Sequence, residues 1–306
     1  MIALFPGQGS HAVGMGRALY DQHPAAQDVI DRSDAALPGL KRLMFEGPME
    51  DLTMTAWQQP ALVAAGAAAY AAWKASGGSD ATAFAGHSLG EFTAHVAAGS
   101  LNLEDAITLV HARGRYMQDA VPAGEGAMAA ILKLDAAQVQ AFCDQAPGLV
   151  TIANDNAPAQ QVVSGEAEAV GAVSEAAKTA GGRAVPLAVS APFHCPLMEP
   201  AAERLASDLA AVSFHAASAP IVCNVTAAPL ADPQDAPKRL TEQVTGTVRW
   251  TDTVRFLAGT YPTERFLEFG SGKVLTGLVG RIVDGREAAP VHDPDTLSQA
   301  LEKESS

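Results

Sequence analysis

Cysteine is scarce in this sequence: only Cys143, Cys195 and Cys223 occur among 306 residues. They are too few and too widely spaced for a disulfide framework or a zinc site, so we expect reduced thiols and no bound metal. Basic residues are also in the minority, because 20 Lys and Arg face 34 Asp and Glu and leave a net charge of -14. Nucleic acids and anionic membrane surfaces attract clustered Lys and Arg, so this balance argues against both as partners.

Long hydrophobic runs are absent as well. The longest apolar stretch, residues 61–73, is too short for a membrane span, and its alanine content is typical of a buried helix. No basic leader with an apolar signal core opens the sequence, because Met1–Phe5 runs directly into Pro6 and Gly7. We therefore expect a cytoplasmic protein. The hydrophobic share of 48% allows one large core, or one large domain carrying a smaller one.

Apolar segments rich in β-forming residues alternate with longer helical patterns, which predicts an α/β fold with a largely parallel sheet. The predicted strands of this large domain are residues 2–5, 82–86, 220–224 and 265–269. We assign the large domain to residues 1–120 and 192–306 and expect it to be α/β-hydrolase-like.

The pattern of predicted strands and helices changes between residues 121 and 191. This segment predicts the order strand, helix, strand, strand, helix, strand over residues 126–132, 135–146, 149–154, 160–165, 166–180 and 183–189. That order is the split βαβ arrangement of a ferredoxin-like (α+β) subdomain. We expect it to be inserted into the large domain.

The stretch GHSLGE at residues 86–91 places Ser88 between two glycines. A predicted strand precedes it, and a predicted helix from Leu89 to Ala98 follows it, which is the context of a nucleophile elbow. The first free N–H groups of that helix, including that of Leu89, could stabilise an oxyanion. The alternative is a chance Gly-Ser-Gly turn. We interpret Ser88 as a nucleophile.

A serine hydroxyl needs a base, and the sequence has eight histidines. His194 lies between Pro192 and Pro196, where the chain is stiffened as it re-enters the large domain, so it is the best candidate. The alternative is a structural histidine in a proline-rich crossing. His87 adjoins the serine, but neighbouring side chains on a tight turn diverge, so we expect at most a supporting or substrate-contact role.

A charge occupies a core-facing position in the predicted helix 103–119, whose expected N-cap is Asn102. Arg113 lies on the same face as the apolar residues Ala106 and Val110. A buried arginine must be paired with an anion or lie in a polar cleft. One reading is an ion pair with an internal Asp or Glu, and the other is a bidentate clamp for a substrate carboxylate.

Glycine-rich loops supply two further expectations. The loop FPGQGS at residues 5–10 lacks the spacing of a phosphate-binding motif, but the backbone N–H of Gln8 could be a second oxyanion donor. Near the loop GSGKVLTG at residues 270–277, Lys273, Arg281 and Arg286 are candidates for a basic docking patch.

Six motifs together resemble those of malonyl-CoA:acyl carrier protein transacylases. They occur in the family's order over nearly the whole chain: FPGQGS, QQPA at 58–61, GHSLGE, HARGRYMQ followed by AVPAGEGAM, SAPFHCPLM and GSGKVLTGL. The resemblance implies a malonyl-serine intermediate, transfer to the phosphopantetheine thiol of acyl carrier protein, and a place in fatty-acid or polyketide chain extension. It implies no permanently bound cofactor, since malonyl-CoA is the substrate. Oligomeric state is outside the motifs, and a monomer is our default.

The resemblance also implies the site residues. It gives Ser88 the malonyl group, makes His194 the base, pairs Arg113 with the malonyl carboxylate, and takes oxyanion donors from the backbone of Gln8 and Leu89. The family orients the histidine with a backbone carbonyl, and the matching position is Gln243, in the last turn of a predicted helix from 236 to 245. Phe193 resembles the residue type that favours malonyl over methylmalonyl units.

Two other functions compete with this one. A hydrolase would need an acid and a histidine after the nucleophile, and Asp252 or Asp284 with His292 has that order. This alternative leaves Arg113 and His194 without a role. A non-catalytic docking subunit would not need an intact Ser88 and His194.

Overall fold

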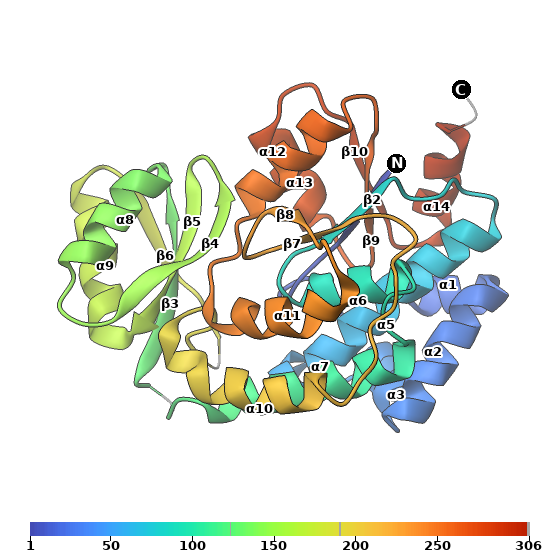
Figure 1. Ribbon diagram of the computed structural model, residues 1–306, viewed down its shortest axis with the longest axis horizontal. Coiled ribbons are helices and arrows are strands. Elements are labelled where there is room, and N and C mark those ends of the chain that lie inside the picture. The colour runs from blue at the N-terminus through green and yellow to red at the C-terminus, as the bar shows by residue number, and fades with distance from the viewer. Residues whose placement is uncertain (123, 190, 305–306) are drawn as a thin grey trace.

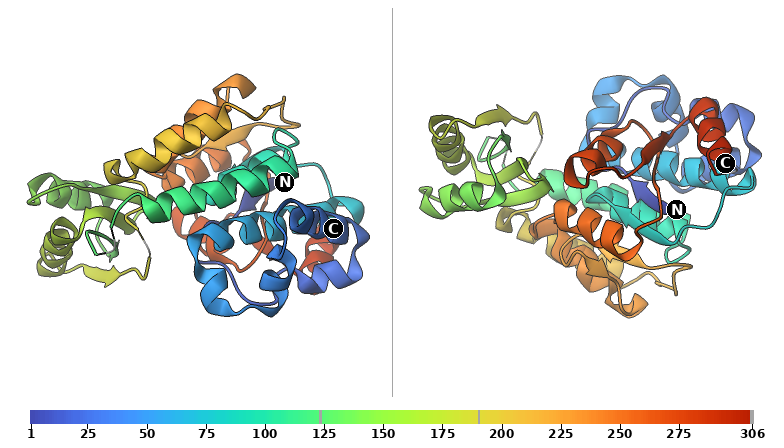
Figure 2. Two further views of the ribbon diagram at one scale, coloured as in Figure 1. Left: turned by 90° about the horizontal axis from the view of Figure 1, so that it is seen from below. Right: turned by 90° about the horizontal axis from the view of Figure 1, so that it is seen from above.

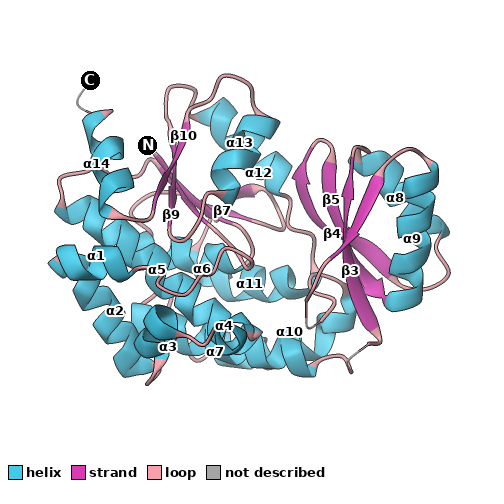
Figure 3. Cartoon of the chain, turned by 180° about the vertical axis from the view of Figure 1, so that it is seen from behind, coloured by secondary structure: helices cyan, strands magenta, loops and turns pink. Residues whose placement is uncertain are grey.

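The computed structural model describes residues 1–122, 124–189 and 191–304. It is a mixed α/β structure with two separate sheets, and the smaller sheet stands to one side of the larger (Figures 1 and 3). None of the described helices has the length and apolar character needed to cross a membrane.

The larger sheet has the strand order β10-β9-β1-β2-β7-β8, and every neighbouring pair is parallel except β7 and β8. Its strands are β1 (Ile2–Phe5), β2 (Ala83–Gly86), β7 (Ile221–Cys223), β8 (Ala228–Pro229), β9 (Phe266–Phe269) and β10 (Ala288–Val291). The four predicted strands are confirmed to within a residue. The sequence pattern missed β8 and β10, because two residues carry no periodicity and the Ala-Ala-Pro start of β10 has little β propensity.

Alternate residues of β1 enter different cores, which makes the large unit three-layered. Ala3 and Phe5 pack against one helical layer, whereas Ile2 and Leu4 pack against the other. The first layer contains α1 (Arg17–Gln22), α2 (Pro24–Ala36), α3 (Leu40–Glu46), α4 (Met49–Thr53), α5 (Thr55–Ala75), α6 (Leu89–Ala97), α7 (Leu103–Asp119), α10 (Glu199–Leu209), α11 (Ala236–Thr245) and α14 (Pro294–Glu302). The second contains α12 (Trp250–Thr260) and α13 (Val274–Ile282).

Helices α5 and α7 pack with their backbones close together. Pro60 lies inside α5 and has no N–H, so the Ala56 carbonyl is left free and accepts a hydrogen bond from His111 Nδ1 of α7 at 2.8 Å. A Cβ at Gly114 would lie 2.6 Å from the Ala56 Cα, so only glycine allows this approach. At the start of α7, Asn102 is the N-cap as expected, although its side chain makes no cap hydrogen bond.

The smaller sheet is antiparallel and has the order β4-β5-β3-β6. Its elements are β3 (Gly126–Leu132), α8 (Ala136–Gln145), β4 (Val150–Ala157), β5 (Gln160–Glu166), α9 (Ala167–Thr179) and β6 (Arg183–Pro186). The predicted element order is confirmed. The predicted strand 183–189 is too long, because the chain leaves the sheet after Pro186, and residues 187–189 line the cavity described below. Both views in Figure 2 show this unit extending away from the larger one.

Strand β4 joins the two units. Backbone hydrogen bonds connect Ala153 and Asp155 to Val248, just before α12. The register of β4 shifts twice, between Ile152 and Asn154 and between Asp155 and Ala157. Such irregularities redirect side chains, and they place Asn154 in the cavity wall.

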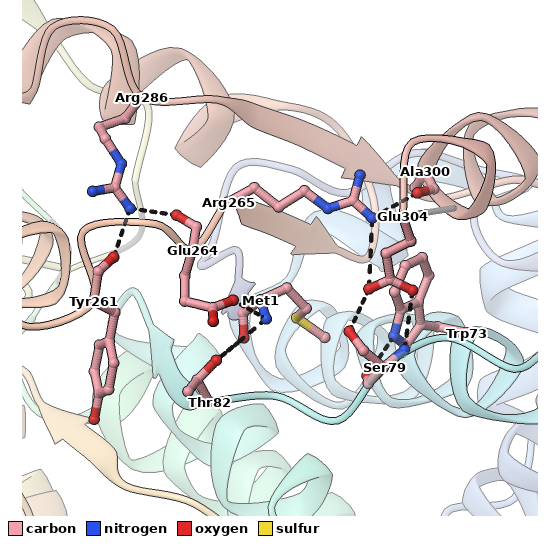
Figure 4. A network of polar contacts seen from close by, with 10 residues as sticks. All are labelled: Met1, Trp73, Ser79, Thr82, Tyr261, Glu264, Arg265, Arg286, Ala300 and Glu304. Carbon is pink, nitrogen blue, oxygen red and sulfur yellow. Dashed lines mark hydrogen bonds and ion pairs between the residues drawn. The ribbon is translucent and has the colours of Figure 1, made fainter. Parts of the chain in front are cut away.

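A polar network lies where strands β1, β2 and β9 of the larger sheet begin (Figure 4). The Met1 ammonium group contacts Glu264 and donates to Thr82, which ties β1 to the loops before β2 and β9. Arg286 donates to the backbone carbonyls of Tyr261 and Glu264, near the end of α12. These bonds use the Arg286 guanidinium inside the fold and argue against its predicted docking role, which stays a prediction.

Candidate active site

Ser88 occupies a strained turn between β2 and α6. Its backbone angles are φ 50° and ψ -107°, a region that L-residues rarely adopt. A Cβ at Gly90 would lie 2.0 Å from the carbonyl oxygen of Phe5, and one at Gly86 would lie 1.9 Å from the Gly90 carbonyl. Glycine is thus required on both sides of Ser88, because strand and helix backbones nearly touch there.

Asn224, which the sequence analysis missed, holds this turn in place. Its Oδ1 accepts a hydrogen bond from the Ser88 N–H at 2.6 Å, and its Nδ2 donates to the Gly86 carbonyl at 2.7 Å. The residue directly follows β7, the neighbour of β2 in the sheet. The sequence contained one signal for Asn224: it is a polar residue at the carboxyl end of a predicted strand, and the carboxyl ends of parallel strands meet at one edge of the sheet.

The Ser88 hydroxyl lies 2.7 Å from Nε2 of His194, and Nδ1 of His194 lies 2.8 Å from the Gln243 carbonyl oxygen. A carbonyl only accepts, so Nδ1 carries the proton and Nε2 is left to accept from Ser88. Burial, with a smaller effect of Arg113, lowers the pKa of His194 to about 3. The imidazole is therefore neutral at physiological pH.

Arg113 lies behind the serine and has no direct anionic partner among the described residues. Its Nη1 donates to Gln59 Oε1 at 2.9 Å, and its Nη2 donates to Ser88 Oγ at 3.3 Å and to Gln243 Oε1 at 3.1 Å. Its Nε is buried and has no hydrogen-bond partner among the described residues. Burial lowers the pKa of Arg113 to about 10, which still leaves the group charged at neutral pH. The ion pair considered from the sequence is absent from the described residues.

Three side-chain amides and a histidine form a chain of hydrogen bonds from Arg113 toward the surface. Gln59 accepts from Arg113 and donates to Gln8 Oε1 at 3.3 Å, and Gln8 donates to Gln58 Oε1 at 3.0 Å. Gln58 in turn lies 2.8 Å from Nδ1 of His11. The chain fixes the FPGQGS loop against α5, and the motif QQPA supplies two of its members.

A cavity of about 470 Å³ opens beside Ser88. Among the residues named so far, Gln8, His11, Gln58, Asn154, Ser88 and His194 line it, and Met54, Met128, Leu187, Ala188 and Val189 form an apolar part of its wall. Arg113 and Gln243 are not in the wall. Among the described residues, no three His, Cys, Asp or Glu side chains are grouped as metal ligands.

The other predicted contact residues also lie at this cavity. Phe193 and His87 line it, and His87 Nε2 lies 2.7 Å from Asn156 Oδ1. Among the described residues, the backbone N–H groups of Gln8 and Leu89 donate to no acceptor. Both donors are thus available to a bound group.

The residues of the rival hydrolase are not at Ser88. His292 pairs with Asp293 at the start of α14, and Asp252 pairs with Arg249 at the start of α12. Asp284 follows α13 and is exposed. None of these residues lines the cavity beside Ser88.

The chain matches known proteins over nearly its whole length. The family model described as "Acyl transferase domain" matches residues 3–261. The malonyl CoA-acyl carrier protein transacylase of Bacillus subtilis (strain 168) is 45% identical over 305 residues, covering 98% of this chain and 95% of that protein. The corresponding protein of Escherichia coli (strain K12) is 42% identical over 303 residues, covering 98% of each.

Solved structures agree with these sequence matches. A malonyl-transacylase in complex with its type II PKS acyl-carrier protein has a TM-score of 0.95 at 41% identity, covering 99% of each chain. This level of identity extends the likeness beyond the fold to the family.

Proposed function

This chain belongs to the malonyl CoA-acyl carrier protein transacylase family, and on that premise we propose that its cavity transfers a malonyl group from malonyl-CoA to the phosphopantetheine thiol of acyl carrier protein. The product supplies fatty-acid or polyketide chain extension. The observation that carries the assignment is a buried, unpaired Arg113 within 3.3 Å of a serine that is hydrogen-bonded to a neutral histidine.

Acylation begins at Ser88. His194 Nε2 accepts the hydroxyl proton as Oγ attacks the thioester carbonyl, and the Gln243 carbonyl holds the imidazole through Nδ1. The substrate carboxylate replaces the neutral oxygens that now contact Arg113, forming the bidentate pair for which a guanidinium is suited. Neutralising Arg113 also removes one cause of the low pKa of His194, so the bound carboxylate makes the base stronger.

The tetrahedral oxyanion needs donors whose hydrogen bonds are free. The backbone N–H groups of Gln8 and Leu89 meet that condition among the described residues, and Leu89 is the first residue of α6. Their fixed position would stabilise the oxyanion without reorganisation. Collapse expels CoA and leaves a malonyl-Ser88 ester.

The second half-reaction repeats these steps in reverse. The carrier thiol gives its proton to His194 and attacks the ester, so the reaction is ping-pong. The apolar side chains of Met54, Leu187 and Val189 in the cavity wall would contact the phosphopantetheine arm. Phe193, also in the wall, limits the space beside the malonyl carbon.

Intact-protein mass after brief mixing with malonyl-CoA or acetyl-CoA tests the function. We expect a malonyl adduct on Ser88 in the native chain, little acetyl adduct, and loss of the malonyl adduct in Arg113→Ala. The reason is that an acetyl thioester has no carboxylate to form the bidentate pair with Arg113, and we expect the loss of that pair to cost about 100-fold in rate. Release of free acid without an adduct would instead identify a hydrolase.

Finer expectations extend the proposal. The strand order of the small sheet supports a ferredoxin-like subdomain over residues 121–191, and the elbow after a parallel strand supports a hydrolase-like large unit over residues 1–120 and 192–306. We keep the monomer, the cytoplasm and the lack of a resident cofactor as parts of the proposal. Lys273 and Arg281 are exposed on α13 and its N-cap, and they remain the proposed docking cations for the carrier protein.

A further inference from the structure

Glu91 is a buried carboxylate that the proposed mechanism does not use. It lies in the first turn of α6 with a relative exposure of 1%, three residues after Ser88. Its Oε2 accepts hydrogen bonds from the Asn224 N–H at 3.1 Å and from Gln243 Nε2 at 2.6 Å. Its Oε1 is buried with no hydrogen-bond partner among the described residues. A carboxylate this deep needs a compensating positive charge.

The nearest such charge is Arg113, and Gln243 connects the two groups. The Gln243 amide accepts from Arg113 Nη2 at 3.1 Å and donates to Glu91 Oε2 at 2.6 Å. The same amide donates to the Ser88 carbonyl at 3.0 Å, so its orientation is fixed. With one amide between them, the guanidinium and the carboxylate compensate each other without forming a direct ion pair.

A substrate carboxylate disturbs this balance, because the pocket would then contain two anions and one cation. A second anion in a buried site raises the pKa of a carboxyl group, and Glu91, whose Oε1 accepts no hydrogen bond among the described residues, is the group that takes the proton. We propose that Glu91 is the resident counter-ion of Arg113, and that it takes up one proton from solvent when the malonyl carboxylate binds. This inference rests on the proposed function, because it assumes that a carboxylate reaches Arg113.

Burial raises the pKa of Glu91 to about 7 in the empty site, with Arg113 among the weaker opposing influences. Above that pH the carboxyl is ionised, and binding must include the uptake of a proton. Malonyl-CoA affinity should therefore fall by up to tenfold per pH unit above 7, until the pH reaches the raised pKa of the complex.

The described titratable groups named next face Glu91, and their pKa shifts take them out of the range between about pH 7 and 9. On α7, Arg113 has a pKa near 10, and the pKa of Cys223 on β7 is raised by burial. Burial lowers the pKa of His95, on α6 itself, to about 4, and that of His194 to about 3. Gln243 and Asn224, which donate hydrogen bonds to the carboxylate, do not ionise, and the Cys223 thiol, which also interacts with it, is kept protonated by its raised pKa.

Proton uptake can be measured by titrating Ser88→Ala protein with malonyl-CoA at about pH 8 in two buffers of different protonation enthalpy. This variant binds without acyl transfer. We expect an uptake approaching one proton with malonyl-CoA and none with acetyl-CoA, which also corrects for titration of the CoA phosphates. In Ser88→Ala combined with Glu91→Gln, the uptake should vanish. Affinity at pH 8 should then rise about tenfold, because no carboxylate needs to be protonated.

Equal uptake with the two thioesters, or uptake that persists in the Glu91→Gln protein, would overturn the counter-ion role. If Glu91 had only a structural role, Glu91→Gln would weaken malonyl-CoA binding equally at pH 6 and pH 8. If Glu91→Gln does not fold, infrared difference spectra of Ser88→Ala decide, because malonyl-CoA must produce the carbonyl band of a protonated carboxyl group. Failure of the underlying function is distinguishable, since the native chain would then form no malonyl adduct.

Discussion

At the scale of single residues, the site depends on keeping three ionisable groups in unusual states. Arg113 is charged without an adjacent anion, His194 is neutral because it is buried beside a cation, and Glu91 lies one amide away. Each state depends on the others, because every charge in the pocket shifts the pKa of its neighbours. The malonyl carboxylate is the missing member of this set.

The first prediction concerns the acid limb of the pH profile. His194 acts as a base only when neutral, and its lowered pKa of about 3 keeps it neutral far below the usual histidine range. Activity would be lost only as pH falls through that low value, so kcat/KM for malonylation should stay flat between about pH 5 and 7. Rates of adduct formation by quenched mass spectrometry check this, with circular dichroism as the control for folding. A decline centred near pH 6.5 would contradict it.

At the scale of elements, the nucleophile is positioned by how closely β1, β2 and α6 approach one another. The glycines of the elbow are needed because backbone atoms occupy the space where a Cβ would be. Asn224 after β7 then bonds both sides of the turn. The strained angles of Ser88 are maintained by these neighbours and not by its own sequence context.

Gly90→Ala tests this packing. The new Cβ would lie 2.0 Å from the Phe5 carbonyl oxygen, and backbone cannot move aside cheaply. We expect a loss of about 3 kcal/mol or more in the free energy of unfolding, together with loss of adduct formation. Gly277→Ala in α13 is the matched control, because nothing lies within 4 Å of its Cβ. Removing a helix-interior glycine should raise stability by about 0.5–1 kcal/mol.

Urea unfolding of both variants measures the difference. Equal stability of the two proteins would mean that β1 and α6 can separate without cost, and the close-packing account of the elbow would fail.

At the scale of the whole molecule, charge must be distributed unevenly for an acidic enzyme to meet an acidic carrier. The chain carries -14 overall, and many of its cations are paired with carboxylates or, like Arg286, with backbone carbonyls. Lys273 and Arg281 are exposed and make no ion pair among the described residues. Gly272, next to Lys273, packs near Ser10 of the FPGQGS loop, which adjoins the cavity.

Charge reversal tests this distribution. In Lys273→Glu combined with Arg281→Glu, we expect KM for acyl carrier protein to rise about tenfold and to lose its salt dependence, while malonylation by malonyl-CoA is unchanged. Lys178→Glu combined with Arg183→Glu, both exposed on the smaller unit, serves as the control because it makes the same change in net charge. An unchanged KM for the carrier would remove α13 from the docking surface.

Long-range contacts also explain what the sequence analysis missed or placed wrongly. Arg286 was considered for a docking surface, and its guanidinium donates to backbone carbonyls at the end of α12, a contact that no local pattern reveals. Asn224 and Glu91 escaped notice because their importance lies in bonds to residues more than a hundred positions away. Strand 183–189 was predicted too long, since its last residues have strand-like character but form cavity wall.

The sequence by itself determined the element order of the smaller unit, the turn around Ser88 and the family, because glycine spacing, hydrophobic periodicity and linked motifs are local or ordered properties of a chain. It also singled out Arg113, since a charge on an apolar helix face is visible without coordinates. Tertiary structure alone decided between an internal ion pair and a free clamp, and it alone brought the Gln243 side-chain amide, Glu91 and Asn224 around the serine. The physical reason is that charge compensation and hydrogen bonding in a buried pocket depend on distances, which only the packed chain defines.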